Sequence, residues 1–162
     1  MIGVDVPGIA FREAEPRDEV FLRKLYRESR EAELAPTGWS EDVKRAFTDS
    51  QFTLQDRHYR SQYRAASFLV MERAGTPIGR LYVQRDANEL RLIDVLLAAP
   101  LRNAGIGTAI LEGLQRDAAQ HGIAMTLHVD AHNRARALYA RLGFREEGSD
   151  GPYVRMRWVP PR

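Results

Sequence analysis

The sequence predicts a mixed α/β fold, in which one largely antiparallel sheet of six to seven strands carries about four helices on its faces. Three short apolar segments with strand character follow one another between residues 67 and 97, as consecutive antiparallel strands do. Longer segments with apolar residues at helical spacing lie on both sides of them. The length of 162 residues suits one domain, 1–162.

The first part of the chain predicts one strand and two helices. Residues 9–12 suit a short strand, and Asp18 can cap a helix over about 19–34. The Pro-Thr-Gly sequence at 36–38 breaks that helix. A capping signal then opens a second helical stretch, 40–63, in one or two pieces.

A three-strand meander comes next. Residues 67–72, 78–83 and 90–97 have the pattern of strands, joined by turns at 75–77 and 86–88. The remaining elements are a helix, a strand, a helix and two strands, at 105–120, 123–129, 133–142, 144–147 and 153–158. The Gly-Ser-Asp-Gly-Pro sequence at 148–152 is expected to form the loop between the last two strands.

The amino-acid composition excludes several kinds of chemistry and of partner. The chain has no cysteine, which removes disulfides, thiolate metal sites and a covalent acyl-cysteine mechanism. No signal peptide is evident and no apolar run approaches the roughly 20 residues of a membrane helix, so we expect a cytoplasmic protein without a membrane partner. All but Lys24 and Lys44 of the 24 basic residues are arginines, interleaved with acids, so no nucleic-acid partner is expected.

A glycine-rich segment links the strand at 90–97 to the following helix. Gly105 and Gly107 open that helix, and glycine lets backbone N–H groups approach a ligand without a Cβ in the way. The first helical turn adds unpaired N–H donors and the positive end of a dipole, and Arg102 adds a charge. These features suit a pyrophosphate.

Other interpretations of this segment need weighing. A dinucleotide-binding fingerprint would need a third glycine or an alanine where Ile110 stands. A P-loop would need a lysine after Gly107, where Thr108 follows directly. A plain strand-to-helix turn stays open on this segment alone.

A second motif downstream changes the interpretation. The sequence Arg-x-x-Gly-x-Gly at 102–107, followed after a strand by Asn-x-Ala-x-x-Leu-Tyr-x-x-Leu-Gly-Phe at 133–144, resembles the GNAT N-acetyltransferase superfamily. The resemblance covers about 90–158 well and the upstream segments more loosely. Two features depart from the usual pattern: Ala-Pro-Leu at 99–101 replaces Pro-Glu-Tyr, and the Asn-to-Tyr spacing is the shorter of two common versions.

The resemblance implies a GNAT-like fold in which the strands matching 90–97 and 123–129 splay into a V that holds acetyl-CoA as co-substrate. The backbone at Leu96 and Leu97 would pair with the pantetheine arm, and Asn133 would meet the cofactor near it. The pyrophosphate would bind the loop and the helix start, at Arg102, Asn103, Ala104, Gly105, Ile106, Gly107 and Thr108.

The resemblance also implies direct transfer of an acetyl group to a primary amine of a small molecule or a peptide. Tyr139, which it places near the thioester sulfur, is the candidate general acid, because its hydroxyl donates with a pKa of about 10. The candidate bases are His128, whose ring titrates near neutral pH, and Asp94, a carboxylate in an otherwise apolar strand.

Two further sets of residues bear on the site. His128, Asp130 and His132 alternate and would share one strand face, but no third nitrogen or thiolate is evident nearby, so no metal is expected. The side that receives the acceptor amine has candidates in the early helices and the meander, namely Trp39, His58, Tyr59, Arg80 and Tyr82.

Competing hypotheses share the phosphate loop. A non-catalytic acyl-CoA-binding regulatory module would keep the loop and lack a working acid and base. An enzyme that moves a longer acyl chain would need small residues near the acetyl group, and Ala98 and Ala99 keep that option open. A homodimer is a possible assembly, since dimers are common in the superfamily, although no feature of the sequence requires one.

Overall fold

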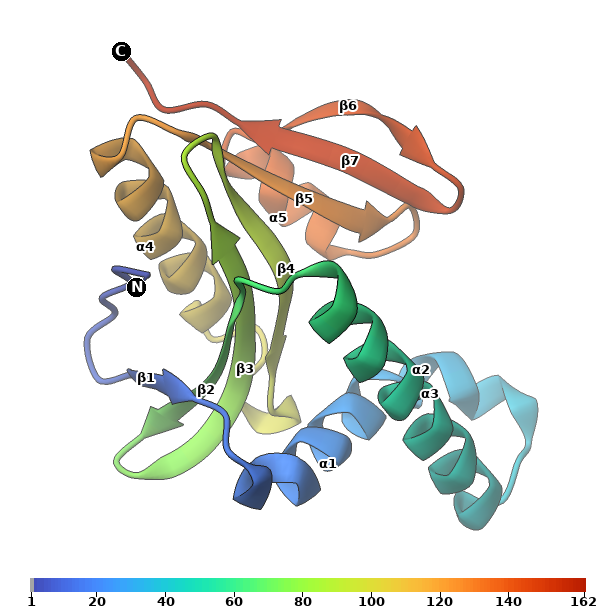
Figure 1. Ribbon diagram of the computed structural model, residues 1–162. Helices are drawn as coiled ribbons and strands as arrows, with labels where there is room; N and C mark the ends of the chain where they lie inside the picture. Colours follow the sequence, from blue (N-terminus) through green and yellow to red (C-terminus); the bar gives the residue numbers. More distant parts are fainter. Residues whose placement is uncertain (1) are drawn as a thin grey trace.

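The computed structural model describes residues 2–162 and shows a seven-stranded mixed sheet with the strand order β1-β2-β3-β4-β5-β7-β6 (Figure 1). Neighbouring strands are antiparallel except for β4 and β5, which are parallel. The strands are β1 (Ala10–Glu13), β2 (Ser67–Arg73), β3 (Thr76–Arg85), β4 (Glu89–Leu97), β5 (Ala124–Asp130), β6 (Arg145–Asp150) and β7 (Tyr153–Trp158).

Five α-helices accompany the sheet: α1 (Glu19–Ser29), α2 (Glu31–Leu34), α3 (Glu41–Gln62), α4 (Ile106–Gln120) and α5 (Ala135–Arg141). The expectation of one helix over 19–34 is wrong, because the chain tightens at Arg30, whose N–H donates to Arg27. The Ser29 hydroxyl donates to the Tyr26 carbonyl at 2.5 Å and so competes for the acceptor that a continuing helix would use. Within residues 2–162, no helix has the length and apolar character needed to cross a bilayer.

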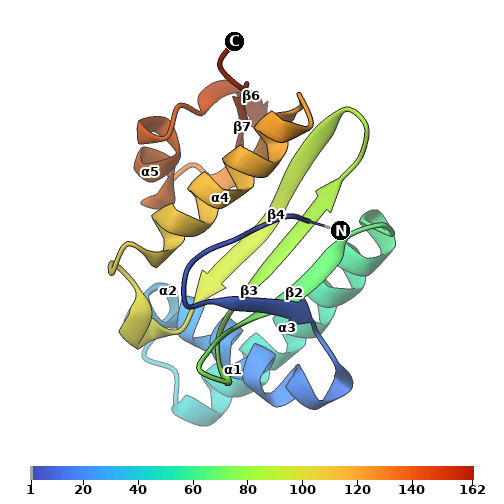
Figure 2. The ribbon, with the colours of Figure 1, turned by 90° about the vertical axis from the view of Figure 1, so that its left-hand side faces the viewer.

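Helices cover both faces of the sheet. α4 and α5 pack on one face against β4 and β5, and α1 packs on the other against β3 and β4 and also contacts α3. Figure 2 shows α4 crossing the near face, with α1 and α3 beyond the sheet. The larger core lies on the α4 side, and a smaller one lies between α1, α3 and the sheet, formed by Leu22, Tyr26, Phe52 and Val70.

β4 and β5 pair over a short stretch only. Their parallel register joins Glu89–Leu92 to Ala124–Leu127, and β4 then continues to Leu97 without β5. β5 pairs with β7 along its length instead, and β4 and β5 diverge in Figure 1. This arrangement is the splayed V expected from the sequence, and it leaves one backbone edge of β4 without a partner strand.

A β-bulge in β4 sits where the V opens. Three residues of β4, 92–94, oppose two residues of β3, so Ile93 is the extra one. Leu92 before the bulge and Val95 after it both pack in the core on the α4 side. They are three residues apart, so the alternation of side chains between the two faces shifts by one residue at the bulge. The bulge therefore turns Asp94 toward the opposite face, which carries α1 and α3.

The last hairpin is longer than expected. The loop predicted at 148–152 is wrong, because β6 runs through Gly148 to Asp150 and only the Gly-Pro pair at 151–152 turns. A register shift between Glu146 and Gly148 absorbs the extra residue as a bulge. Strand pairing with β7 thus overrides the local turn preference and carries Asp150 to the tip of the hairpin.

Gly79 is a position where the sheet has no room for a side chain. A Cβ there would lie 2.4 Å from the carbonyl oxygen of Leu96 and 2.7 Å from the methyl group of Met71. We expect Gly79→Ala to lower the free energy of unfolding by about 1–3 kcal/mol, because the β4 backbone would have to move. Urea denaturation followed by circular dichroism measures this change.

Gly113→Ala is the matched control in α4. A Cβ at Gly113 would find ordinary contacts, with the nearest atoms at 3.6 Å, and alanine favours the helix. The free energy of unfolding should stay equal or rise by about 0.5–1 kcal/mol. Equal stability losses in both variants would contradict the specific role given to Gly79.

Candidate active site

The segment between β4 and α4 forms a tight loop that leads into a donor-rich helix start. A 3₁₀ turn at Ala99–Leu101 leaves β4, and Asn103 and Gly105 then adopt positive φ angles of 63° and 83°. α4 begins at Ile106 without a side-chain cap at its N-terminus. The N–H groups of its first turn therefore have no partner from the helix or from a cap, and they lie at its positive end.

Gly107 has no role in packing or in backbone geometry. A Cβ at this position would meet no atom within 4 Å, and its φ is not positive. Alanine would be the better helix former here. The open space in front of the first turn fits a pyrophosphate, whose oxygens must approach these N–H groups closely.

The free edge of β4 and the start of α5 flank the V. Leu97 pairs with Gly79 of β3 on one side, while β5 has diverged on the other. The side chain of Arg102 folds back, and its Nε donates to the Leu97 carbonyl at 3.2 Å. Asn133 accepts the N–H of Ala135 through Oδ1 at 2.9 Å, which orients its amide at the start of α5.

Tyr139 projects from α5 beside the V. It is 8% exposed and packs edge-to-face on Phe144, with the ring centroids 5.7 Å apart. Burial raises the pKa of its hydroxyl to about 12, and the charge of Asp94 adds to the rise. The phenol is therefore protonated at neutral pH.

Asp94 is held by a buried arginine. Nε of Arg80 donates to its Oδ2 at 2.7 Å, Nη2 forms an ion pair with the same oxygen at 2.5 Å, and the Arg80 side chain is only 1% exposed. Gln55 of α3 accepts from Arg80 Nη2 at 2.8 Å. Across residues 2–162 no donor pairs with Asp94 Oδ1, and the side chain is 22% exposed. One oxygen of Asp94 thus stays available to a ligand.

Tyrosines surround this ion pair. The ring of Tyr82 lies 4.6 Å from the guanidinium carbon of Arg80 and edge-on to Tyr59, at 6.1 Å between centroids. Burial raises the pKa of both tyrosines above the ordinary value, so both stay neutral. His58 lies beside Tyr59. Trp39 precedes the 22-residue α3, at the end away from Tyr59, so it does not join this cluster.

His128 lies on β5, across the V from Asp94, and both of its ring nitrogens are engaged. Nε2 lies 2.7 Å from Oδ2 of Asp150, and Nδ1 contacts Nη2 of Arg91. Because an arginine can only donate, Nδ1 is the acceptor and the ring proton belongs on Nε2. As placed, His128 has no free lone pair for an incoming amine unless Arg91 moves.

The side chains of His128, Asp130 and His132 do not converge on a metal site. Asp130 Oδ1 accepts the backbone N–H of His132 at 2.9 Å in a local turn, and His128 is turned to Asp150. Over the described part of the chain, 2–162, no three His, Asp or Glu side chains are placed to hold a metal ion.

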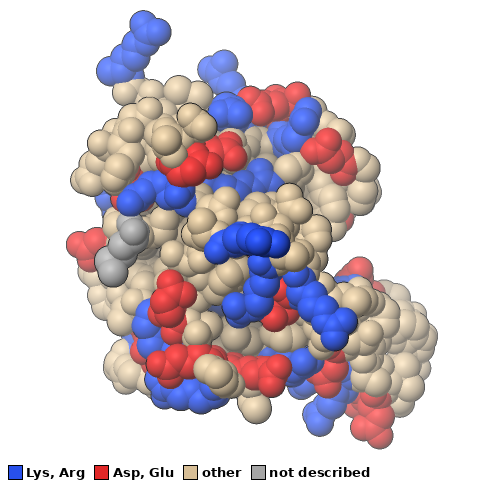
Figure 3. Space-filling model, viewed as in Figure 1, with Lys and Arg blue, Asp and Glu red and all other residues tan. Residues whose placement is uncertain are grey.

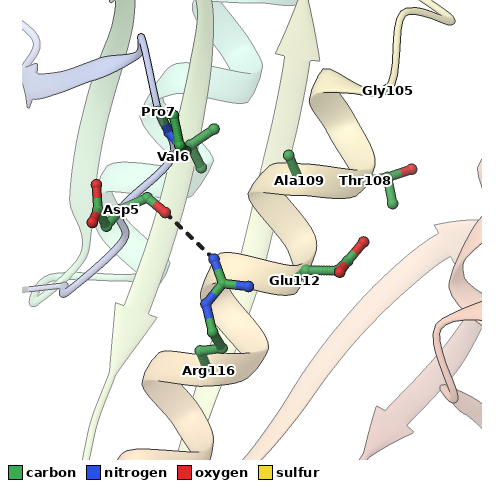
Figure 4. Close-up of a pocket in the computed structure, with 8 residues that line it drawn as sticks. All are labelled: Asp5, Val6, Pro7, Gly105, Thr108, Ala109, Glu112 and Arg116. Atoms are coloured by element: carbon green, nitrogen blue, oxygen red, sulfur yellow. Dashed lines mark hydrogen bonds between the residues drawn. The ribbon is translucent and has the colours of Figure 1, made fainter.

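A hollow of about 340 Å³ lies between α4 and the N-terminal segment (Figure 4). Gly105 and one side of α4 as far as Arg116 line it, and Arg116 donates to the carbonyl of Asp5 at 3.4 Å. The side chains of Thr108 and Glu112 are directed away from the N-terminal segment. The hollow therefore occupies one flank of α4 and meets the predicted pyrophosphate site at Gly105 and Thr108.

Sequence reasoning does not find three residues of this region: Gln55, Arg91 and Asp150. Gln55 stands one helical turn before Tyr59, so the spacing indicates a shared helix face once Tyr59 is suspected. Asp150 is hidden in the predicted loop, and Arg91 has the pattern of an ordinary solvent-facing strand residue.

Solved structures of known proteins share this fold. The PaiA N-acetyltransferase from Thermoplasma acidophilum, in complex with coenzyme A, is similar with a TM-score of 0.69 and 24% identity over 93% of this chain and 98% of its own. Ard1 from Thermoplasma volcanium is similar with a TM-score of 0.59 and 17% identity over 96% of this chain and 99% of its own. The ribosomal-protein-S18-alanine N-acetyltransferase from Escherichia coli is similar with a TM-score of 0.59 and 20% identity over 95% of each chain. At these identities the likeness establishes the fold.

The sequence itself carries the family assignment. No curated protein matches it significantly. The model of the acetyltransferase (GNAT) family matches residues 21–144, which is more than half of the chain. The matched range runs from α1 to the end of the Asn-to-Phe motif and includes the V and the glycine loop. The chain therefore belongs to the GNAT acetyltransferase family and is an acyltransferase.

Proposed function

We propose that residues 1–162 form one N-acetyltransferase domain, which transfers an acetyl group from acetyl-CoA directly to a primary amine of a small molecule or a peptide. The observation that carries the proposal is the V between β4 and β5. A donor-rich loop lies beyond the end of β4, and a neutral phenol and a carboxylate with one free oxygen lie beside it. The coenzyme A complex of the PaiA enzyme supports the choice of co-substrate.

Acetyl-CoA binding is assigned to the loop, the helix start and the β4 edge. The N–H groups within residues 103–108 and the charge of Arg102 would hold the pyrophosphate. Leu96 and Leu97 offer backbone groups to the amides of the pantetheine arm, as an added strand would. Arg102 would then leave the Leu97 carbonyl, and Asn133 would close the opposite wall. Bound in this way, acetyl-CoA supplies an activated thioester.

The chemistry requires a neutral amine and a proton for the leaving thiolate. The amine nitrogen bonds to the carbonyl carbon as the carbon–sulfur bond breaks. Tyr139 donates its proton to the departing sulfur, and Asp94 Oδ1 takes the proton that the nitrogen loses. That proton returns to Tyr139 through water, so the products are the N-acetylated amine and CoA.

Asp94 is a better-placed base than His128. Its Oδ1 is free and Arg80 orients the carboxylate through Oδ2, whereas both ring nitrogens of His128 are taken. The charge of Asp94 also contributes to the raised pKa of Tyr139, which supports the assignment of the proton acceptor and the proton donor to one site. His128 becomes the alternative base if Arg91 is displaced.

A panel of primary amines tests the activity. CoA release is followed with small alkylamines, amino acids, polyamines and short peptides, at a saturating concentration of acetyl-CoA. We expect release with at least one of these classes. Tight binding of acetyl-CoA without release in any class would favour the acyl-CoA-binding module instead.

Substitution of Gly107 separates cofactor binding from folding. We expect Gly107→Ala to raise the dissociation constant of acetyl-CoA about tenfold or more, because the methyl group fills the space where the pyrophosphate approaches. The free energy of unfolding should rise by about 0.5–1 kcal/mol, since alanine favours the helix. Calorimetric titration and thermal denaturation measure the two effects. Gly113→Ala in the same helix is the control, and unchanged affinity in Gly107→Ala would contradict the loop assignment.

Removal of the Tyr139 hydroxyl tests the general acid. We expect Tyr139→Phe to lower kcat about 10²-fold with little change in acetyl-CoA affinity, because the ring still packs on Phe144. With its pKa raised to about 12, Tyr139 stays protonated as the pH rises, so its ionisation should cause no loss of rate below about pH 11. Tyr63→Phe is the control, and an equal rate in Tyr139→Phe would refute the role.

A further inference from the structure

The sheet face opposite α4 and α5 is polar along β5 and β7. Core residues alternate there with Thr126, His128, Arg155 and Arg157, which point away from the larger core. α1 packs on this side of the sheet against β2, β3 and β4. Figure 3 shows Lys and Arg side chains prominent near the centre of the molecule, between β5–β7 above and the helices below.

Arg91 carries an uncompensated charge on this face. It precedes the bulge in β4, opposite Gln84 of β3 and beside Thr126 of β5. Its guanidinium contacts His128, and among residues 2–162 it forms no ion pair with a carboxylate. Other arginines on this face each pair with an acid, namely Arg80, Arg155 and Arg157.

Buried polar atoms without partners lie beside Arg91 and on the neighbouring part of β3. Gln84 Oε1 and Thr126 Oγ1, which flank it in the strand register, have no hydrogen bond within residues 2–162, and neither has Tyr82 Oη. Thr126 is 6% exposed and Tyr82 is 1% exposed. Buried polar groups in proteins are nearly always paired, so this group of three calls for polar atoms of a ligand.

We infer that Arg91 is the anion-recognising residue of the acceptor site, and that the acceptor carries a carboxylate in addition to its amine. The inference rests on the proposed acetyl transfer. The guanidinium fork matches a carboxylate, and the hydroxyls of Thr126 and Tyr82 are donors for the same group. One unpaired arginine balances one negative charge, which favours a carboxylate over a dianionic phosphate.

The strand geometry sets the length of such an acceptor. Arg91 and Asp94 lie three residues apart on β4, on the same face because of the bulge between them. At a rise of about 3.3 Å per residue, the amine at Asp94 and the carboxylate at Arg91 would be separated by roughly 7–10 Å. The carboxylate replaces Nδ1 of His128 as the partner of Arg91.

A matched pair of probes tests the inference. kcat/KM is measured for 6-aminohexanoate and for its neutral amide, 6-aminohexanamide, with acetyl-CoA saturating. The wild type should prefer the carboxylate by about 10- to 100-fold, mainly through KM. Arg91→Gln should lose this preference, mainly through a higher KM for 6-aminohexanoate, and Arg91→Lys should keep part of it. Arg73→Gln, an exposed residue at the end of β2, should keep all of it.

The outcomes separate the acceptor class from the activity itself. Equal rates on the two probes in the wild type, or a preference that persists in Arg91→Gln, overturn the inference, while turnover of the amide still supports acetyl transfer. If neither probe is acetylated, saturation-transfer NMR on the protein–CoA complex decides. Binding of 6-aminohexanoate that is lost in Arg91→Gln supports the anion site, and absence of binding in the wild type overturns it.

Discussion

Backbone N–H and C=O groups inside a sheet need partners, and this protein leaves a row of them unpaired where β4 loses β5 after Leu92. The proposed cofactor site depends on this divergence of β5 from β4. β3 pairs with β4 as far as Leu97 on the other side, and Gly79 lets the two backbones approach closely enough to hold the free edge in place. An extended ligand with amide groups can complete the ladder, so the missing pairing is also the binding surface.

The direction in which Asp94 points depends on one extra residue in β4. Without the bulge at Ile93, alternation would point Asp94 into the core beneath α4, where a carboxylate would be costly to bury. With it, Asp94 reaches Arg80. A buried ion pair loses much of its Coulomb energy to desolvation, and Gln55 and the Tyr82 ring offset part of that loss. The pair therefore serves mainly to position Asp94, and through Gln55 it connects α3 to the active site.

Local signals were sufficient for much of the fold. The helix predicted at 105–120 is α4, Ile106–Gln120, and the meander is present as predicted, because apolar periodicity and glycine punctuation agree there. The prediction failed where interactions compete with local preference. The Ser29 hydroxyl takes a helix acceptor and divides α1 from α2, and β7 draws Asp150 into a strand through a sequence that favours a turn.

The sequence by itself determined the family, the order of the elements and the glycine loop, because each of these is written in contiguous residues whose backbone preferences are local. Only the tertiary structure decided which charged groups meet. Asp94 and Gln55 lie 14 and 25 residues from Arg80 in the chain, and they converge through strand register, a bulge and helix packing. The surroundings of Arg91 follow from the same register across three strands. These features arise from long-range pairing, which no local pattern encodes.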